Sequence, residues 1–419
     1  MKMFIFISLF LFTLSQSTIA QGPAEGNFKF LQNAYTNRTS NTLSFVVAEH
    51  LQYIAMFWES ADTDQALFML GSMYEEDSDF ARAFLTYLKF KFMFPNSNRR
   101  KDAISNLNQI VHNKAEGTFE EKRKDIDELI SKSLSFPDLN SATYEYLDFI
   151  YTLNIPDVNE LLLSEIRFYS QRYPKTAKNP DQLAYWSGEI LQRLSDYEEA
   201  IVAYKKISFI APQSPLIPQT LLRIGQLQYK ETSEYQLSKD SFVKLISAYP
   251  ETPEAAEGQY YLAQLYEDKL DQPDEAVTNY RILVETYPQS PFAVKALQRV
   301  AEIMDDKEKY TEAIATYQQI FELYPQDPYA PTALLEIESI YRRDLEKYEK
   351  AIEVLKLYSE QYPQRADAAE RLSDAAEMYM DELNNKQAAI DTYNEVANKF
   401  PGTEYAKKAL ESIEDLQKE

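Results

Sequence analysis

The sequence contains no cysteine, only two histidines, His50 and His112, and only eight glycines in 419 residues. Without a thiol the chain has no disulfide, no thiolate nucleophile, no Cys/His zinc site and no lipid-bearing cysteine. No glycines are spaced as in a phosphate-binding loop, and no His-Glu-x-x-His segment occurs. We therefore predict a protein that is not an enzyme and that uses no cofactor and no metal.

Basic residues are also few, since 43 Lys and Arg stand against 66 Asp and Glu, for a net charge of −23. Nucleic acids and anionic lipid surfaces would repel such a chain, so neither is an expected partner. Hydrophobic residues make up 45% of the sequence, which is typical of a globular protein and excludes intrinsic disorder.

The one long apolar segment lies at the N-terminus. Lys2 precedes a mostly apolar stretch from Met3 to Leu14, and small residues lie three residues and one residue before a cleavage site that follows Ala20. The stretch is too short to cross a bilayer core of about 30 Å and is typical of a secretory signal. We predict a signal peptide over residues 1–20, cleaved before Gln21, with an uncleaved anchor as the alternative. The mature protein would then be exported, periplasmic or secreted, and without an integral membrane segment.

Aromatic–proline steps recur along the chain at intervals of 37 or 38 residues, and six of the seven residues that precede these prolines are aromatic. The prolines are Pro174, Pro212, Pro250, Pro288, Pro325, Pro363 and Pro401. A fixed period between 20 and 50 residues is the signature of stacked structural repeats. A repeat array usually provides a binding surface rather than an active site.

Each interval reads as two helices. In the unit from Pro288 to Pro325, Ser290-Pro291 is placed as an N-cap followed by a proline in the first turn. Apolar residues at helical spacing then indicate one helix up to Met304 and a second from Tyr310 to Tyr324, which the next proline ends. Small residues recur twelve residues before and thirteen after most of these prolines, with Glu338 as an exception, so we expect the two helices of a pair to approach closely. The small residues are Ala200, Ser238, Ala276, Ala313, Ala351, Ala389, Gly225, Ala263, Ala301 and Ala376.

The pattern resembles the tetratricopeptide repeat family, in which Leu-Gly or Leu-Ala and Tyr in the first helix precede Ala, an aromatic residue and proline. Two sets of residues carry the resemblance: Leu70-Gly71, Tyr74, Ala83, Tyr87 and Phe94-Pro95, and Ala263, Tyr266, Ala276 and Tyr280. The period of 37–38 departs from the family's usual 34. The Tyr-Pro-x-Ser/Thr joints are similar to those of exported bacterial members of the Tol–Pal coordinating and outer-membrane-assembly type. The resemblance implies an all-α, right-handed superhelical solenoid of antiparallel helix pairs.

The predicted organisation has four parts. Residues 1–20 are the signal, and residues 21–60 are a polar leader and a capping helix. Diverged helix pairs follow over residues 61–174, with a long turn near Gly117. Residues 175–419 form the regular array, which ends in a cap helix.

The predicted function is that of a non-catalytic scaffold or adaptor of the bacterial cell envelope. In this family the first helices line the concave groove, so their non-core side chains would hold a partner protein or peptide of some basic character. A glycan- or small-ligand-binding accessory module of an envelope enzyme is the alternative, homotypic stacking of arrays is another, and the oligomeric state is left open. Counting from each proline gives these candidate partner-binding residues: Glu257, Tyr260, Gln264, Lys295, Gln298, Glu302, Thr332, Leu335, Ser339, Arg342, Glu370, Ser373 and Glu377.

Overall fold

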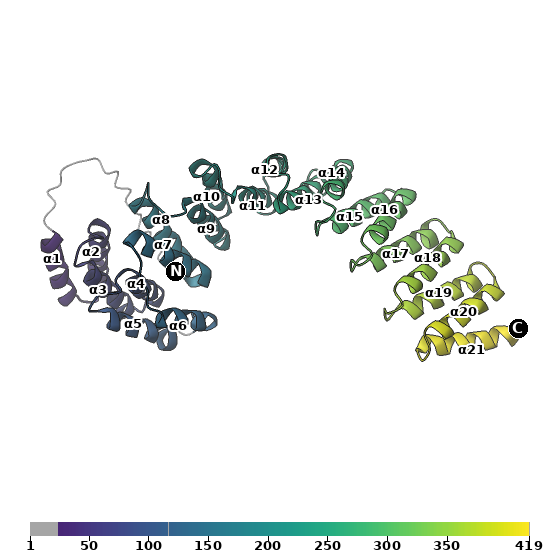
Figure 1. The fold of residues 1–419 in the computed structure, drawn as a ribbon, viewed down its shortest axis with the longest axis horizontal. Helices are drawn as coiled ribbons and strands as arrows, with labels where there is room; N and C mark the ends of the chain where they lie inside the picture. Colours follow the sequence, from purple (N-terminus) through teal and green to yellow (C-terminus); the bar gives the residue numbers. More distant parts are fainter. Residues whose placement is uncertain (1–23, 116, 419) are drawn as a thin grey trace. The chain divides into compact units, whose positions relative to one another are not determined.

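The computed structural model describes residues 24–115 and 117–418 (Figure 1). The predicted signal peptide and its cleavage site lie outside the described residues. Within these ranges all regular structure is helical, and the chain has the architecture of an all-α helical-repeat solenoid. The chain divides after Ala200 into two compact units, referred to below as unit 1 and unit 2.

Unit 1 contains the N-terminal helices, drawn from purple to blue-green in Figure 1. They are α1 (Ala24–Thr36), α2 (Leu43–Met56), α3 (Thr63–Glu76), α4 (Phe80–Met93), α5 (Arg100–Gln109), α6 (Arg123–Ser131), α7 (Leu139–Leu153), α8 (Asn159–Arg172) and α9 (Pro180–Arg193). The boundary between the units falls within α10 (Tyr197–Ile210).

Unit 2 is a regular succession of helix pairs, in which each helix packs against the next along the chain. Its helices are α11 (Ile217–Lys230), α12 (Tyr235–Ala248), α13 (Pro253–Asp268), α14 (Pro273–Thr286), α15 (Ala293–Asp306), α16 (Tyr310–Leu323), α17 (Ala330–Ser339), α18 (Tyr348–Gln361), α19 (Ala368–Asp381), α20 (Lys386–Lys399) and α21 (Glu404–Lys418). The last turn of α17 continues as a π-helix over Ile340–Asp344.

The small residues are buried at the contacts between paired helices, as predicted. Ala263, Ala276, Ala301 and Ala313 are fully buried. At Gly225 an added Cβ would lie 2.5 Å from a ring carbon of Phe242 on α12, so only glycine allows this ring to lie against α11. The register read from the sequence therefore identifies the core of unit 2 correctly.

The aromatic–proline steps end the second helices, also as predicted. The even-numbered helices from α12 to α20 each end two residues before the repeat proline. The predicted helix starts are wrong for most pairs, because the Ser–Pro and Asp–Pro steps lie in the preceding turn. The Ser290 hydroxyl accepts from the backbone N–H of Phe292 at 3.2 Å, and Asp327 accepts from that of Tyr329 at 2.8 Å. These side chains close a local turn, and only α13 begins at its proline, Pro253.

The turn within each pair contains a non-glycine residue in the left-handed region. In unit 2 these residues are Ser233, Asp271, Glu308, Glu346 and Asn384, with φ between 47° and 57°. Their spacing repeats the period of the prolines, so the same turn recurs in each of these repeats. Glycine would adopt this conformation without steric strain, but these positions hold other residues, for which the left-handed region costs about 1–2 kcal/mol.

Unit 1 departs from the regular pattern in two places, at α1 and between α5 and α6. The predicted polar leader contains a helix, α1, because Phe28 and Leu31 bury their side chains there. Between α5 and α6 the chain forms a π-helix (Ile110–Lys114) and a long turn, in which Gly117 has φ of 85°.

Lys91 is buried and donates to the carbonyl oxygens of Ile130 and Lys132 at the end of α6. Burial lowers the pKa of Lys91 to about 8.

Candidate functional site

The predicted partner-binding residues lie on the first helices α13, α15, α17 and α19 and on the π-helix that follows α17. We call this surface the first-helix face and define it by the positions seven, ten, eleven, fourteen and seventeen residues after each repeat proline. On α13, α15, α17 with its π-helix, and α19, every side chain at these positions is at least partly exposed except Ser373. Their exposure makes the surface accessible to a partner.

Two of the predicted residues offer less surface than expected. Ser373 is only 7% exposed and its hydroxyl donates to the carbonyl of Ala369 within α19, so it is not available to a partner. The ring of Tyr260 lies 5.6 Å from that of Tyr280 and 5.2 Å from that of Phe292. The Tyr260 side chain is therefore partly used in packing between repeats, and only its remaining edge can contribute to binding.

Polar side chains join neighbouring first helices across this face. Gln226 on α11 donates to Glu257 on α13 at 2.9 Å. Tyr229, also on α11, donates to Asp268 at the end of α13 at 2.7 Å. These contacts fix the two helices side by side and present a polar surface rather than an apolar one.

Glu267 makes the main polar contacts between α13 and α15. It accepts a hydrogen bond from the buried Tyr280 hydroxyl at 2.9 Å and forms an ion pair with Arg299, which also pairs with Glu302. The ion pairs raise the pKa of the Arg299 guanidinium, and burial beside Glu267 raises the pKa of the Tyr280 hydroxyl. Arg299 thus offsets much of the negative charge of Glu267 and Glu302 within the chain.

The charge is compensated less between α15 and α17. Burial, with Asp305 and Glu302 nearby, raises the pKa of the Glu336 carboxyl, and burial and the charge of Asp344 raise that of Asp305. Arg343 opposes both shifts only in part. In the part of the chain that the structure describes, neither Glu336 nor Asp305 forms an ion pair. Partly buried carboxylates of like charge are held close together here, which favours a cation from outside the chain.

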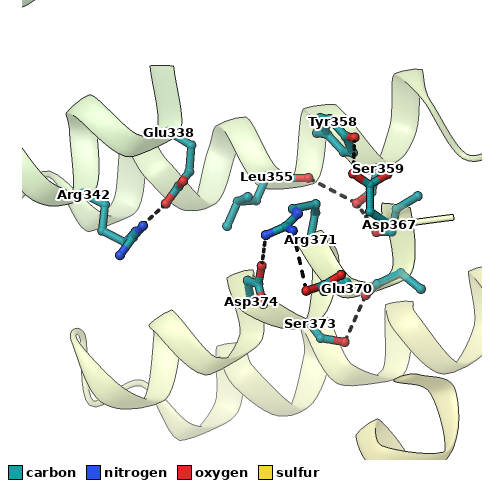
Figure 2. Close-up of polar contacts among 12 residues, drawn as sticks. Glu338, Arg342, Leu355, Tyr358, Ser359, Asp367, Glu370, Arg371, Ser373 and Asp374 are labelled. Atoms are coloured by element: carbon teal, nitrogen blue, oxygen red, sulfur yellow. Dashed lines mark hydrogen bonds and ion pairs between the residues drawn. The ribbon is translucent and has the colours of Figure 1, made fainter. Parts of the chain in front are cut away.

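The interface of α17 with α19 carries a third acidic group (Figure 2). Arg371 lies between Asp374, at 2.8 Å, and Glu370, at 3.5 Å, while Arg342 pairs with Glu338 at 2.7 Å. Burial raises the pKa of Asp374, and Arg371 opposes this effect only in part because other carboxylates surround the site. The predicted residue Arg342 is thus engaged within its own chain.

The position eleven residues after each proline is absent from the sequence prediction. It holds Tyr261, Arg299, Glu336 and Asp374, of which Arg299 and Asp374 form ion pairs described above. Residues three and four positions apart both lie on the same side of a helix, and the prediction took only the step of three, from position seven to position ten. Including residue i+4 from position seven would have found all four residues.

The described residues contain no group of three or more His, Asp or Glu side chains arranged as metal ligands. Among the helices of residues 24–115 and 117–418, none combines the length and apolar character needed to cross a membrane.

Comparison with known protein families agrees with the helix-pair geometry. Residues 295–327 and 374–403 match the model of the tetratricopeptide repeat. These two segments of the chain are therefore tetratricopeptide repeats. In addition, residues 176–306 of this repeat protein match the model of the outer membrane lipoprotein family YfiO. The 419 residues contain no cysteine that could carry a lipid, so the similarity concerns the repeats.

Several solved structures are similar to this chain at low identity. A tetratricopeptide repeat protein from Parabacteroides merdae is 16% identical, with 65% of this chain and 98% of that chain covered and a TM-score of 0.35. The pilus biogenesis factor PilW is 18% identical, with 56% and 100% covered and a TM-score of 0.30. MamA from Desulfovibrio magneticus is 19% identical, with 46% and 99% covered and a TM-score of 0.34. No curated protein matches the sequence.

Proposed function

We propose that this protein is an exported scaffold of the bacterial cell envelope whose first-helix face binds a basic segment of a partner protein. The tetratricopeptide repeat architecture supports a role in protein interaction. Each repeat adds one first helix to the face, so an extended or helical peptide can cross several repeats and contact each of them.

The observation that carries the proposal is that the carboxylates of Asp305 and Glu336 have no ion-pair partner among the residues that the structure describes. Both pKa values are raised by partial burial, so ionisation is disfavoured in the free protein. A lysine or arginine from a partner would stabilise both ionised groups and return their pKa values toward the ordinary range. The basic character of the partner therefore follows from the charge of the face.

The envelope location rests on the signal-like N-terminus and on the similarity to the YfiO family over residues 176–306. Expression of the full chain in a Gram-negative host should yield a mature protein that begins at Gln21. N-terminal sequencing of the periplasmic fraction measures this directly. A chain that keeps Met1 and stays with the membrane pellet would support the uncleaved anchor instead.

Binding can be tested with two fluorescein-labelled peptides of equal length, one made of Lys and Phe and the other of Glu and Phe. We expect the double variant Asp305→Asn/Glu336→Gln to bind the Lys/Phe peptide about tenfold more weakly than the wild type, which corresponds to about 1.4 kcal/mol. The matched control is Glu285→Gln/Glu322→Gln, which removes two exposed carboxylates from the second helices α14 and α16. Equal affinities of the wild type and the Asp305→Asn/Glu336→Gln variant for the Lys/Phe peptide would contradict the proposal.

A further inference from the structure

We infer that a positively charged pocket on the first-helix face binds acidic side chains of the partner protein. The pocket lies between α11, α13 and the start of α15 and has a volume of about 540 Å³. Three lysines, Lys230, Lys269 and Lys295, line it together with several aromatic rings. All of these residues belong to unit 2.

Aromatic rings hold each of the three ammonium groups beside the pocket. The Nζ atom of Lys230 is 4.7 Å from the ring centre of Tyr261 and donates to its hydroxyl at 3.2 Å. Lys269 lies 5.8 Å from the ring centre of Tyr229, and Lys295 lies 5.6 Å from that of Phe292. Cation–π contacts of this kind orient a lysine while leaving its ammonium protons available to an anion.

None of the three lysines forms an ion pair with any residue that the structure describes, although the chain has 66 acidic residues. The nearby carboxylate of Asp268 accepts from the Tyr229 hydroxyl instead. Lys230 and Lys269 lie at the C-terminal ends of α11 and α13, where the helix dipole favours a cation.

Lys295 is placed differently, in the first turn of α15, where the helix dipole disfavours a positive charge. Helix stability therefore does not explain this lysine, whereas a bound anion would. The three lysines form a small cationic surface on a protein of net charge −23, so an acidic group is the complementary ligand.

A peptide is the occupant that the position of the pocket favours. Tyr260, Tyr261, Gln264 and Lys295 line the pocket and are also members of the first-helix face. A segment that follows the face from α17 toward α11 would place a basic stretch near Asp305 and Glu336 and an acidic stretch in the pocket. This inference rests on the proposed function and adds that the partner segment carries charges of both signs.

The same two peptides separate the pocket from the rest of the face. We expect Lys295→Gln to weaken binding of the Glu/Phe peptide about tenfold and to leave binding of the Lys/Phe peptide unchanged. Lys295→Arg should retain most of the affinity, because it keeps the charge. The control Lys244→Gln removes an exposed lysine from α12 that does not line the pocket, and it should have no effect.

Two results would overturn the inference. The first is equal affinity of the wild type and the Lys295→Gln and Lys230→Gln variants for the Glu/Phe peptide. The second is lysine-dependent binding of an oligogalacturonate probe in the absence of any binding of the Glu/Phe peptide, which would assign the pocket to an acidic glycan. The proposed function would fail on a different result, namely equal binding of the Lys/Phe peptide by the wild type and the Asp305→Asn/Glu336→Gln variant, so the two failures are distinguishable. Circular dichroism of each variant verifies that it is folded.

Discussion

Replacement of Gly225 by alanine tests the close approach of α11 and α12 on which the repeat geometry depends. The new Cβ would lie 2.5 Å from one ring carbon of Phe242 and 2.8 Å from two others, well inside the ordinary contact range of 3.4–4 Å. Phe242 is fully buried, and the Gly225 carbonyl already accepts the Ser238 hydroxyl of α12 at 2.8 Å. The ring therefore cannot retreat without moving the helix pair.

The expected cost follows from two opposing effects. Overpacking of a well-ordered core costs about 1–3 kcal/mol, and an approach of 2.5 Å belongs to the upper part of this range, about 2–3 kcal/mol. Alanine is favoured over glycine within a helix by about 1 kcal/mol. We expect a net loss in the free energy of unfolding of about 1–2 kcal/mol, measured by urea denaturation followed by circular dichroism. The control Gly26→Ala in α1 adds a Cβ with no atom within 4 Å, and it should be neutral or stabilising.

A double variant separates steric conflict from other causes. Phe242→Leu shortens the side chain that the new methyl group meets, so Gly225→Ala should cost less in the Phe242→Leu background than in the wild type. The difference is the coupling energy of the double-mutant cycle. Strict additivity of the two substitutions, or a Gly225→Ala variant as stable as the wild type, would refute the close approach.

Three further predictions concern other parts of unit 2. Tyr280→Phe removes a buried hydrogen bond of 2.9 Å and should lower the free energy of unfolding by about 1 kcal/mol, whereas Tyr287→Phe removes a buried hydroxyl without a hydrogen-bond partner among the described residues and should not lower it. Glu308→Gly relieves a left-handed backbone and should raise the free energy of unfolding by about 1 kcal/mol, whereas Gln319→Gly within α16 should lower it by a similar amount; chemical denaturation distinguishes the two signs. The raised pKa of Glu336 means that its ionisation opposes folding at neutral pH and that this effect disappears as the pH falls below the ordinary value of 4.5. Glu336→Gln should therefore have a higher Tm than the wild type at pH 7 and the same Tm near pH 4, and a difference independent of pH would argue against burial as the cause.

Much of the fold could be predicted from the sequence because local steric rules set it. Proline ends a helix that runs up to it and is tolerated only in a first turn, and a small residue is required wherever two helices nearly touch. Pro325 and Ala313 could therefore be interpreted without a structure. The helix starts could not be predicted in this way. A Ser–Pro step such as Ser290-Pro291 is compatible with both an N-cap and a turn, and only the backbone of the joint decides between them.

The candidate site was predictable to a smaller extent. Helical periodicity identified the surface of the first helices but omitted the position of Glu336, because the choice between i+3 and i+4 depends on how neighbouring helices pack. The lysine pocket was inaccessible to sequence reasoning for a different reason. Lys230, Lys269 and Lys295 come from three repeats and occupy different positions within them, so no periodic pattern connects them.

The binding role of the first-helix face is tested most directly by site-specific photocrosslinking in a cell of the source type. A benzoylphenylalanine at Thr332, on the first-helix face of α17, should crosslink the protein to a defined partner after irradiation. The same residue at Leu323, which is 61% exposed on the second helix α16, should give no such product. A partner crosslinked from Leu323 but not from Thr332 would place the binding surface on the opposite helices and contradict the proposed function.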